Sequence, residues 1–447
     1  MSALISSHPL CVSFLSFLLF WVYRSQVFNG DGDQISRMIE SGLWMVQTEL
    51  GSQAIFQLAY RVLSPFGWDG LAVINLVSCL SGAICVYILI LFSRTFFPFS
   101  PAWILGLFFS SGLILFAFGH TEYYTMFLAG LFYYGYTGIG YLRGTHSMLQ
   151  TALAYSIALW MHLGILFALP SLMVLPLLKK KYSDYKYLLI GLSPAYIAYC
   201  IKEFHPLIGM LLKAVIPGSN FTVLGLSPSE NFVALSPENI GTGYYSMFQW
   251  GHLADFLWAW SMRSWFFWQL IIWAAAAQGF RSLLLPERQF LLLYTLCFTF
   301  FAATWHPNLG IHQDWDLFAI EAAPCLLLLM TYLDFFQTHH FRRTVLILLI
   351  LSSSLIHFQQ ILQEAQFDRR QYGTVKIQLS EPIDHKVTMN GHAKDLEING
   401  IREGIYAGKV IDRTYRQSHN FYVHVAPGRQ TTVPLIIGSA PESNLME

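Results

Sequence analysis

The chain has 447 residues, of which 55% are hydrophobic and only 12% are charged. A soluble domain usually carries about 25% charged residues. The composition therefore excludes an ordinary soluble domain and places the chain in the membrane class. The formal net charge is zero, so nothing indicates a nucleic-acid partner. The six cysteines lie in apolar stretches and form no CxxC pair, which is typical of small hydrophobic residues in helices rather than disulfides or metal ligands.

Long apolar runs predict the membrane spans. A helix needs about 20 apolar residues to cross the hydrocarbon core, and about 11 stretches satisfy this requirement approximately. The first run lacks a basic leader and a small-residue cleavage site, so we interpret it as a retained span rather than a signal peptide. The predicted spans are 7–23, 70–93, 101–119, 124–142, 147–162, 164–178, 187–201, 255–278, 289–305, 317–336 and 344–362.

Basic residues predict the orientation of these spans. If the N-terminus is cytoplasmic, every predicted cytoplasmic connection is short and carries Lys or Arg, as the positive-inside rule requires. The opposite loops are longer and richer in Asp, Glu, Asn and His. This alternation holds through all spans and predicts an extracytoplasmic C-terminus. The predicted outer loops are 24–69, 119–123, 162–164, 202–254 and 306–316.

Two regions outside the spans have patterns of their own. Apolar residues recur at helical spacing twice in loop 24–69, which predicts two amphipathic helices in the membrane interface. These residues are Ile35, Met38 and Ile39, then Ile55, Leu58, Ala59 and Val62. Loop 202–254 has the length and Gly, Pro, Ser and Asn content of a binding loop.

The tail 363–447 changes from apolar runs to alternation, as in 375–379 and 421–425. Asn390-Gly391, Asn399-Gly400 and Pro427-Gly428 are turn signals between such stretches. The tail therefore predicts a small antiparallel, sandwich-like β domain outside the membrane. Its Ala426-Pro427-Gly428 turn before a last strand resembles PEGA-type β modules of surface proteins.

Polar residues that could support chemistry gather in the predicted outer loops. They form four clusters: Asn29–Gln34, Gly119–Tyr124, His162, and Trp305–Asp316. Each cluster has a structural alternative. Asp33 could cap a helix, Glu122 and Asp316 could stabilise helix starts, and His162 could be an interfacial histidine. The aromatic residues beside them also match an ordinary interfacial belt.

Taken together, the clusters favour a site. Ionisable groups near membrane depth are costly, so carboxylates and histidines that share one predicted membrane edge require a reason. The candidate residues are Asp31, Asp33, Glu122, Asp314 and Asp316 with His120, His162, His306 and His312.

An Asp-bearing loop directly after the first span, followed by interfacial helices and many spans, resembles the GT-C superfamily of membrane glycosyltransferases. Two further segments, Gly119–Tyr124 and Asp314–Phe318, are similar to segments of uncharacterised bacterial members. The resemblance covers 1–362 in architecture but only short motifs in sequence. It implies a GT-C-like helical domain that transfers a sugar from a polyprenyl-phosphate donor to an acceptor hydroxyl on the extracytoplasmic face, in a bacterial inner membrane.

The resemblance also implies roles for the candidates. Asp31 or Asp33 would be the base that takes the acceptor proton, with a small preference for Asp31, because Asp33 has the alternative role of a cap. Glu122, Asp314 and Asp316 would bind acceptor or metal, and His306 and His312 would bind the donor phosphate. His120 and His162 complete the predicted substrate-binding set. Whether Asp31, Asp33 and Glu122 hold a divalent metal, Mg²⁺ or Mn²⁺, stays open. The nature of the acceptor, which could be a glycan, a protein or a lipid, stays open as well.

Other classes of protein are compatible with the same residues. A proton- or cation-coupled transporter could use carboxylates and histidines, but its site would lie near the midplane, often between repeated halves, and no such halves are evident. Another lipid-linked-substrate transferase or a metal-dependent hydrolase could use 306–316, although this loop has no recognised ligand pattern such as HExxH.

Overall fold

The computed structural model describes residues 8–26, 32–42, 49–97, 101–195, 266–304 and 318–366, a few residues between 250 and 257, and the strands between 372 and 435. The chain divides into two units. One is helical and ends at Gln363. The other consists of two segments, Gln26–Phe28 and Glu364–Glu447, and contains the strands.

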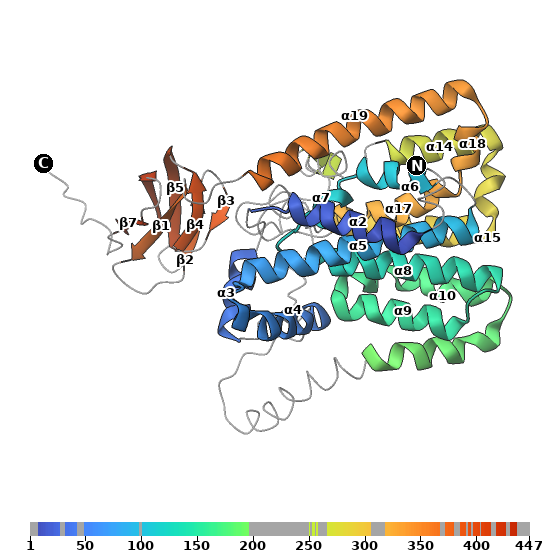
Figure 1. Cartoon of the computed structure of the whole chain (residues 1–447), viewed down its shortest axis with the longest axis horizontal. Coiled ribbons are helices and arrows are strands. Elements are labelled where there is room, and N and C mark those ends of the chain that lie inside the picture. The colour runs from blue at the N-terminus through green and yellow to red at the C-terminus, as the bar shows by residue number, and fades with distance from the viewer. Residues whose placement is uncertain are drawn as a thin grey trace, which may run out of the picture. The chain divides into compact units, whose positions relative to one another are not determined.

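The helical unit is a bundle whose helices run side by side over much of their length (Figure 1). Its α-helices are α2 (Pro9–Val22), α3 (Gly32–Ser41), α4 (Leu50–Leu63), α5 (Gly70–Phe96), α6 (Pro101–Phe109), α7 (Leu113–Ala117), α8 (Tyr124–Arg143), α9 (Met148–Met161), α10 (Leu169–Leu178), α14 (Phe267–Gln278), α15 (Pro286–Thr304), α17 (Ala322–Met330), α18 (Leu333–Gln337) and α19 (His340–Ala365). Short 3₁₀ turns are η1 (Ser64–Phe66), η2 (Leu163–Ala168), η3 (Tyr182–Asp184) and η5 (Phe280–Leu284).

A lipid-facing surface accounts for the apolar composition. Within the described residues, α5 and α19 are long and apolar enough to cross a membrane, and three shorter apolar helices span Pro9–Val22, Met148–Met161 and Leu163–Leu178. Large apolar side chains stand exposed along α2 and α19, among them Leu10, Phe14, Val22, Leu348 and Leu355. Such a surface would be an aggregation hazard in water and suits a bilayer. The protein is a polytopic helical membrane protein.

Two predicted spans are interrupted. Stretch 101–119 forms α6 and α7 with a break at Ser110 and Ser111, whose hydroxyls donate to Leu107 O (2.9 Å) and Phe108 O (2.8 Å). Stretch 317–336 breaks after α17, where Thr331 Oγ1 donates to Leu328 O (2.7 Å). Hydroxyls that bond to the preceding turn compete with helical hydrogen bonds, so uninterrupted helices were wrong for these stretches.

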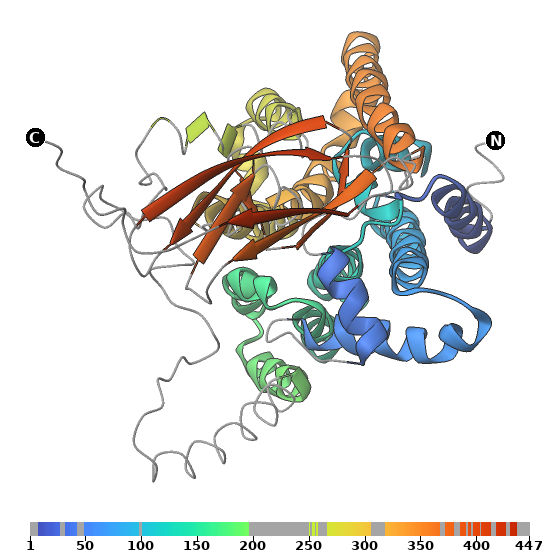
Figure 2. The same cartoon turned by 90° about the vertical axis from the view of Figure 1, so that its left-hand side faces the viewer.

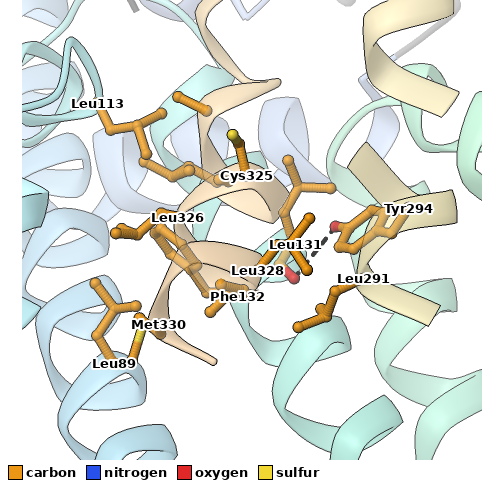
Figure 3. Packing of buried hydrophobic residues seen from close by; sticks show 14 of the residues in the cluster. Leu89, Leu113, Leu131, Phe132, Leu291, Tyr294, Cys325, Leu326, Leu328 and Met330 are labelled. Atoms are coloured by element: carbon orange, nitrogen blue, oxygen red, sulfur yellow. Dashed lines mark hydrogen bonds between the residues drawn. The ribbon is translucent and has the colours of Figure 1, made fainter. Parts of the chain in front are cut away.

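The bundle core joins α5, α7, α8, α15 and α17. Figure 3 shows Leu131 and Phe132 of α8 among Leu291 and Tyr294 of α15 and the leucines of α17. Tyr294 Oη donates to Leu131 O across this core (3.3 Å). Small residues let helices approach closely: a Cβ on Gly130 would lie 2.9 Å from the Cα of Ala158 on α9. This close packing of small residues is how membrane helices associate when lipid removes the hydrophobic driving force.

The two predicted first-loop helices are present as α3 and α4, and they lie at the end of the bundle where α5 and α8 begin (Figures 1 and 2). Ile35 and Ile39 of α3 lie in a small buried cluster with residues of α4, α5 and α8, and Met38 is buried as well. In α4 the apolar residues Leu58 and Val62 face outward instead. The position of α4 in the membrane interface stays a prediction. We call this end of the bundle the first-loop end.

The strand unit contains two sheets. One has the order β4-β1-β7 and the other β3-β2-β5-β6. The strands are β1 (Tyr372–Leu379), β2 (His385–Met389), β3 (His392–Lys394), β4 (Glu397–Arg402), β5 (Gly404–Asp412), β6 (Gln417–Val425) and β7 (Gln430–Leu435). The longest ladder pairs β5 with β6, from Gly404 opposite Val425 to Asp412 opposite Gln417.

Two details of the predicted tail were wrong. β1 and β7 pair in parallel, from Thr374 beside Gln430 to Leu379 beside Leu435, so the tail is not wholly antiparallel. Asn399-Gly400 lies within β4 rather than in a turn. Parallel pairing of strands far apart in the chain leaves no local signal, because no hairpin turn connects them.

Candidate active site

The structure describes only part of the predicted site. His120, Glu122 and His162 are all buried. Asp33 occupies the first turn of α3, of which the backbone is described. The remaining candidates lie outside the described residues: Asp31, His306, His312, Asp314 and Asp316.

The turn that connects α7 to α8, Phe118–Tyr123, is buried and held by distant residues. The backbone N–H of Ser25 donates to Phe118 O (2.6 Å), and Asn75 Nδ2 donates to Ser25 O (3.1 Å). Ser78 Oγ donates to His120 O (2.6 Å). Buried backbone carbonyls need such partners, so residues after α2 and on α5 fix the path of this turn.

The start of α3 lies directly on this turn. A Cβ placed on Gly32 would lie 2.7 Å from Thr121 Cβ and 3.1 Å from Thr121 O, which is closer than real Cβ atoms come without displacement. Only a glycine allows this approach. The aspartates of the predicted first cluster, Asp31 and Asp33, are the chain neighbours of Gly32. Gly32 of the first predicted cluster therefore lies against Thr121 of the second at the first-loop end.

The Cβ of a basic residue, Arg24, lies beside the same turn. Gly119 has φ +82°, and a Cβ there would lie 3.0 Å from Arg24 Cβ. Arg24 Nη1 donates to Trp21 O (2.9 Å), and its guanidinium carbon lies 4.2 Å from the centroid of the Trp21 ring. Arg24 is not among the site residues predicted from the sequence. The available signal was a basic residue immediately after the first span, on the predicted outer side, where basic residues are depleted.

His162 contacts the same region from the turn between α9 and η2. Its Nε2 lies 3.2 Å from Oε1 of Glu49, and its Nδ1 accepts a hydrogen bond from the backbone N–H of Gly164 (2.8 Å). The ring of Tyr124 lies between the two predicted histidines, with centroids 6.4 Å from His120 and 5.3 Å from His162. Glu49 is a second residue that the sequence analysis missed. It precedes the pattern of α4, and only a contact distant in sequence reveals its role.

A buried carboxylate directly before α17 was also missed. Glu321 Oε1 accepts from Thr299 Oγ1 (2.6 Å) and from Trp268 Nε1 (3.2 Å), and the residue is 2% exposed. Its signal was present, because an acidic residue inside a predicted span is costly unless partnered. The side chain joins α14, α15 and α17.

Metal binding stays a prediction. Among the described side chains, no group of three or more His, Cys, Asp or Glu could hold a metal ion. Of the predicted ligands, Glu122 is described, while Asp31 and the side chain of Asp33 are not. The site as described is a buried polar turn at the first-loop end, with a cation and a carboxylate–histidine pair beside it.

No protein-family model matches the chain, and no curated protein matches it in sequence. Two solved structures to which it is similar are those of ArnT from Cupriavidus metallidurans. The apo form is 13% identical over 73% of this chain and 59% of that chain, with a TM-score of 0.46. The form bound to undecaprenyl phosphate is 12% identical over 80% and 73%, with a TM-score of 0.48. This chain thus spans 59% of the length of the apo ArnT chain.

Proposed function

We propose that the protein is an integral membrane glycosyltransferase of the GT-C type, which moves a sugar from a polyprenyl-phosphate donor to an acceptor hydroxyl at the first-loop end. The observation that supports this most is the seating of α3 on the buried turn through Gly32 and Thr121. It places Gly32, which lies between Asp31 and Asp33 in the sequence, against the turn that carries His120 and Glu122. We infer that the predicted base and the predicted substrate-binding groups share one membrane edge.

The chemistry requires few groups. The acceptor oxygen attacks the anomeric carbon, the bond from that carbon to the phosphate oxygen breaks, and the polyprenyl phosphate leaves with the bonding electrons. Asp31 or Asp33 takes the acceptor proton as the new bond forms. Because the leaving group is already a phosphate, it needs a cation rather than a strong acid.

Arg24 supports this proposal as the cation. Its Cβ lies beside Gly119 of the buried turn, and arginine binds phosphate through a planar set of N–H donors. We assign the donor phosphate to Arg24, in addition to His306 and His312. The lipid would lie against the exposed apolar side chains, while its head group reaches the turn.

The test uses purified protein in detergent with radiolabelled polyprenyl-phosphate sugars and a crude acceptor pool. We expect Asp31→Asn or Asp33→Asn to abolish sugar transfer while donor binding is retained. Asp69→Asn is the matched control. Asp69 caps α5 by accepting from the N–H of Ala72 (2.8 Å), a bond that an asparagine oxygen can also accept.

A different result would reject the proposal. If no polyprenyl-phosphate sugar binds or reacts, and both aspartate variants match wild type, the protein is not this kind of transferase. Proton- or cation-coupled uptake into proteoliposomes would then be measured next. Loss of transfer in Arg24→Ala, with donor binding weakened rather than abolished, would support the assignment of the phosphate site.

A further inference from the structure

Both ring nitrogens of His162 are already engaged by the protein. Nδ1 accepts from the backbone N–H of Gly164 at 2.8 Å, and Nε2 lies 3.2 Å from Glu49 Oε1. A backbone N–H can only donate, so Nδ1 must carry a lone pair and no proton. The imidazole is therefore neutral, with its single proton on Nε2, and that nitrogen faces the Glu49 carboxylate at 3.2 Å.

This arrangement leaves His162 no free nitrogen for substrate. A general base needs an available lone pair, and a phosphate ligand needs an available N–H. The Gly164 N–H occupies the lone pair, and Glu49 occupies the N–H. The substrate-binding role predicted for His162 does not fit these hydrogen bonds.

The pair instead connects two elements that border the site. Glu49 is the residue before α4, and its side chain is buried, as is that of His162. Beside the pair, Ser52 Oγ donates to Met161 O (3.0 Å), which connects the start of α4 to the end of α9 a second time. Both connections hold α4 at the end of α9.

The His162 ring also fixes aromatic neighbours. Its centroid lies 5.3 Å from that of Tyr124 and 5.0 Å from that of Phe127, both in the first turns of α8. Tyr124 directly follows the buried turn that carries His120 and Glu122. An imidazole locked at both nitrogens cannot rotate, so it offers these rings a fixed surface.

We propose that His162 and Glu49 form a positioning pair that sets α4 and Tyr124 for the site, without touching donor or acceptor. This inference rests on the proposed function for the reaction that it supports. The geometry assigns Glu49 a role that the sequence pattern does not reveal. It also moves His162 from the substrate-binding set to the residues that hold the site in place.

A double-mutant cycle tests the pair in full-length protein in detergent, with His162→Ala, Glu49→Ala and the double variant. We expect the double variant to lower the thermal midpoint no more than the worse single variant, because either change removes the same interaction. We expect kcat for sugar transfer to fall by about tenfold or more in each, with KM for the donor unchanged, because a misplaced site loses rate rather than affinity.

A conservative variant separates positioning from simple loss of packing. In His162→Gln the Nε2 amide can still donate to Glu49, so we expect recovery of most of the thermal midpoint and of kcat. His146→Ala is the matched control: that histidine packs on Tyr136 (centroids 5.0 Å) in the connection between α8 and α9, and kcat should not change.

If the falls in thermal midpoint of His162→Ala and Glu49→Ala add up in the double variant, the two residues do not act as a pair. A rise in donor KM in His162→Ala, with none in Glu49→Ala, would also overturn it, because His162 would then contact substrate. The thermal cycle needs no sugar transfer. If wild type transfers no sugar but the midpoints remain non-additive, the proposed function fails while the pair itself stands.

Discussion

Each of the two connections at the ends of α8 contains a glycine with a positive φ, but the two glycines have very different surroundings. Gly119 precedes the helix with φ +82°, and Gly144 follows it with φ +85°. A Cβ on Gly144 would meet nothing within 4 Å, whereas one on Gly119 would lie 3.0 Å from Arg24 Cβ and 3.2 Å from Asn75 Oδ1. The backbone conformation is the same, but only the first is enclosed by distant parts of the chain.

The partners of the two connections differ in the same way. After α8, Ser147 caps α9 in a capping box with Gln150, and Thr145 Oγ1 donates to Gly140 O (3.2 Å). Those bonds reach no more than five residues along the chain. Before α8, the bonds come from Ser25 and Ser78. A turn that local bonds satisfy only connects helices, whereas one that residues from several elements hold is typical of a site.

The largest effect is expected at the contact between α3 and the buried turn. In Gly32→Ala the new methyl group must displace Thr121, which is fully buried, so α3 must shift away from the turn. We expect sugar transfer to fall by about 100-fold, as a displacement of about 1 Å costs in a positioned site. Single-turnover rates would measure it, with Gly144→Ala as the control. Unchanged transfer in Gly32→Ala would show that this contact does not position the site.

Alanine substitutions at Gly119 and Gly144, one at a time, measure how much the surroundings of Gly119 add to the loss of stability. Each change costs about 1–2 kcal/mol because L residues disfavour positive φ. Gly119→Ala should cost about 1–3 kcal/mol more, because its methyl group also crowds Arg24 and Asn75. Thermal midpoints in detergent would give the difference. An equal fall of the thermal midpoint in the two variants would mean that the turn before α8 accommodates the added methyl group without cost.

A smaller effect is expected at the two serines. Ser78→Ala removes the hydroxyl that donates to His120 O, and loss of a partner to a buried group costs about 1–3 kcal/mol. Ser147→Ala removes a helix cap and costs about 1 kcal/mol. We expect sugar transfer to fall only in Ser78→Ala. Equal rates of sugar transfer in the two variants would show that the buried turn is not part of the active site.

The same division explains what the sequence could predict. Apolar periodicity and turn chemistry are local, so they gave the membrane class, the helices of the first loop and the approximate span ends, such as α8 at Tyr124–Arg143 against 124–142. The interruptions at Ser110 and Thr331 lay in apolar surroundings where the hydrophobic signal outweighs a single hydroxyl.

The site was harder to predict because its members are joined across long separations. Asp33, Glu122 and His162 were chosen as carboxylates and histidines in predicted outer loops. Glu49 was missed because its partner is His162, more than a hundred residues away. The sequence identified which residue types are costly at a membrane edge, but only the packing of α3 and α4 shows which of them meet.

The smallest effect is expected at the far end of α8, away from the site. Arg143 Nε lies 3.2 Å from Glu287 Oε1, and both side chains are partly exposed. Such pairs contribute about 0–1 kcal/mol, because solvent screens them and both side chains lose freedom. Glu287→Gln should therefore barely move the thermal midpoint and should leave sugar transfer unchanged. Arg143 keeps its bond to Phe96 O (2.7 Å) in that variant, so the helix end stays anchored. A loss of transfer here would mean that the two ends of α8 are coupled, and that enclosure by distant residues is not what distinguishes the first-loop end.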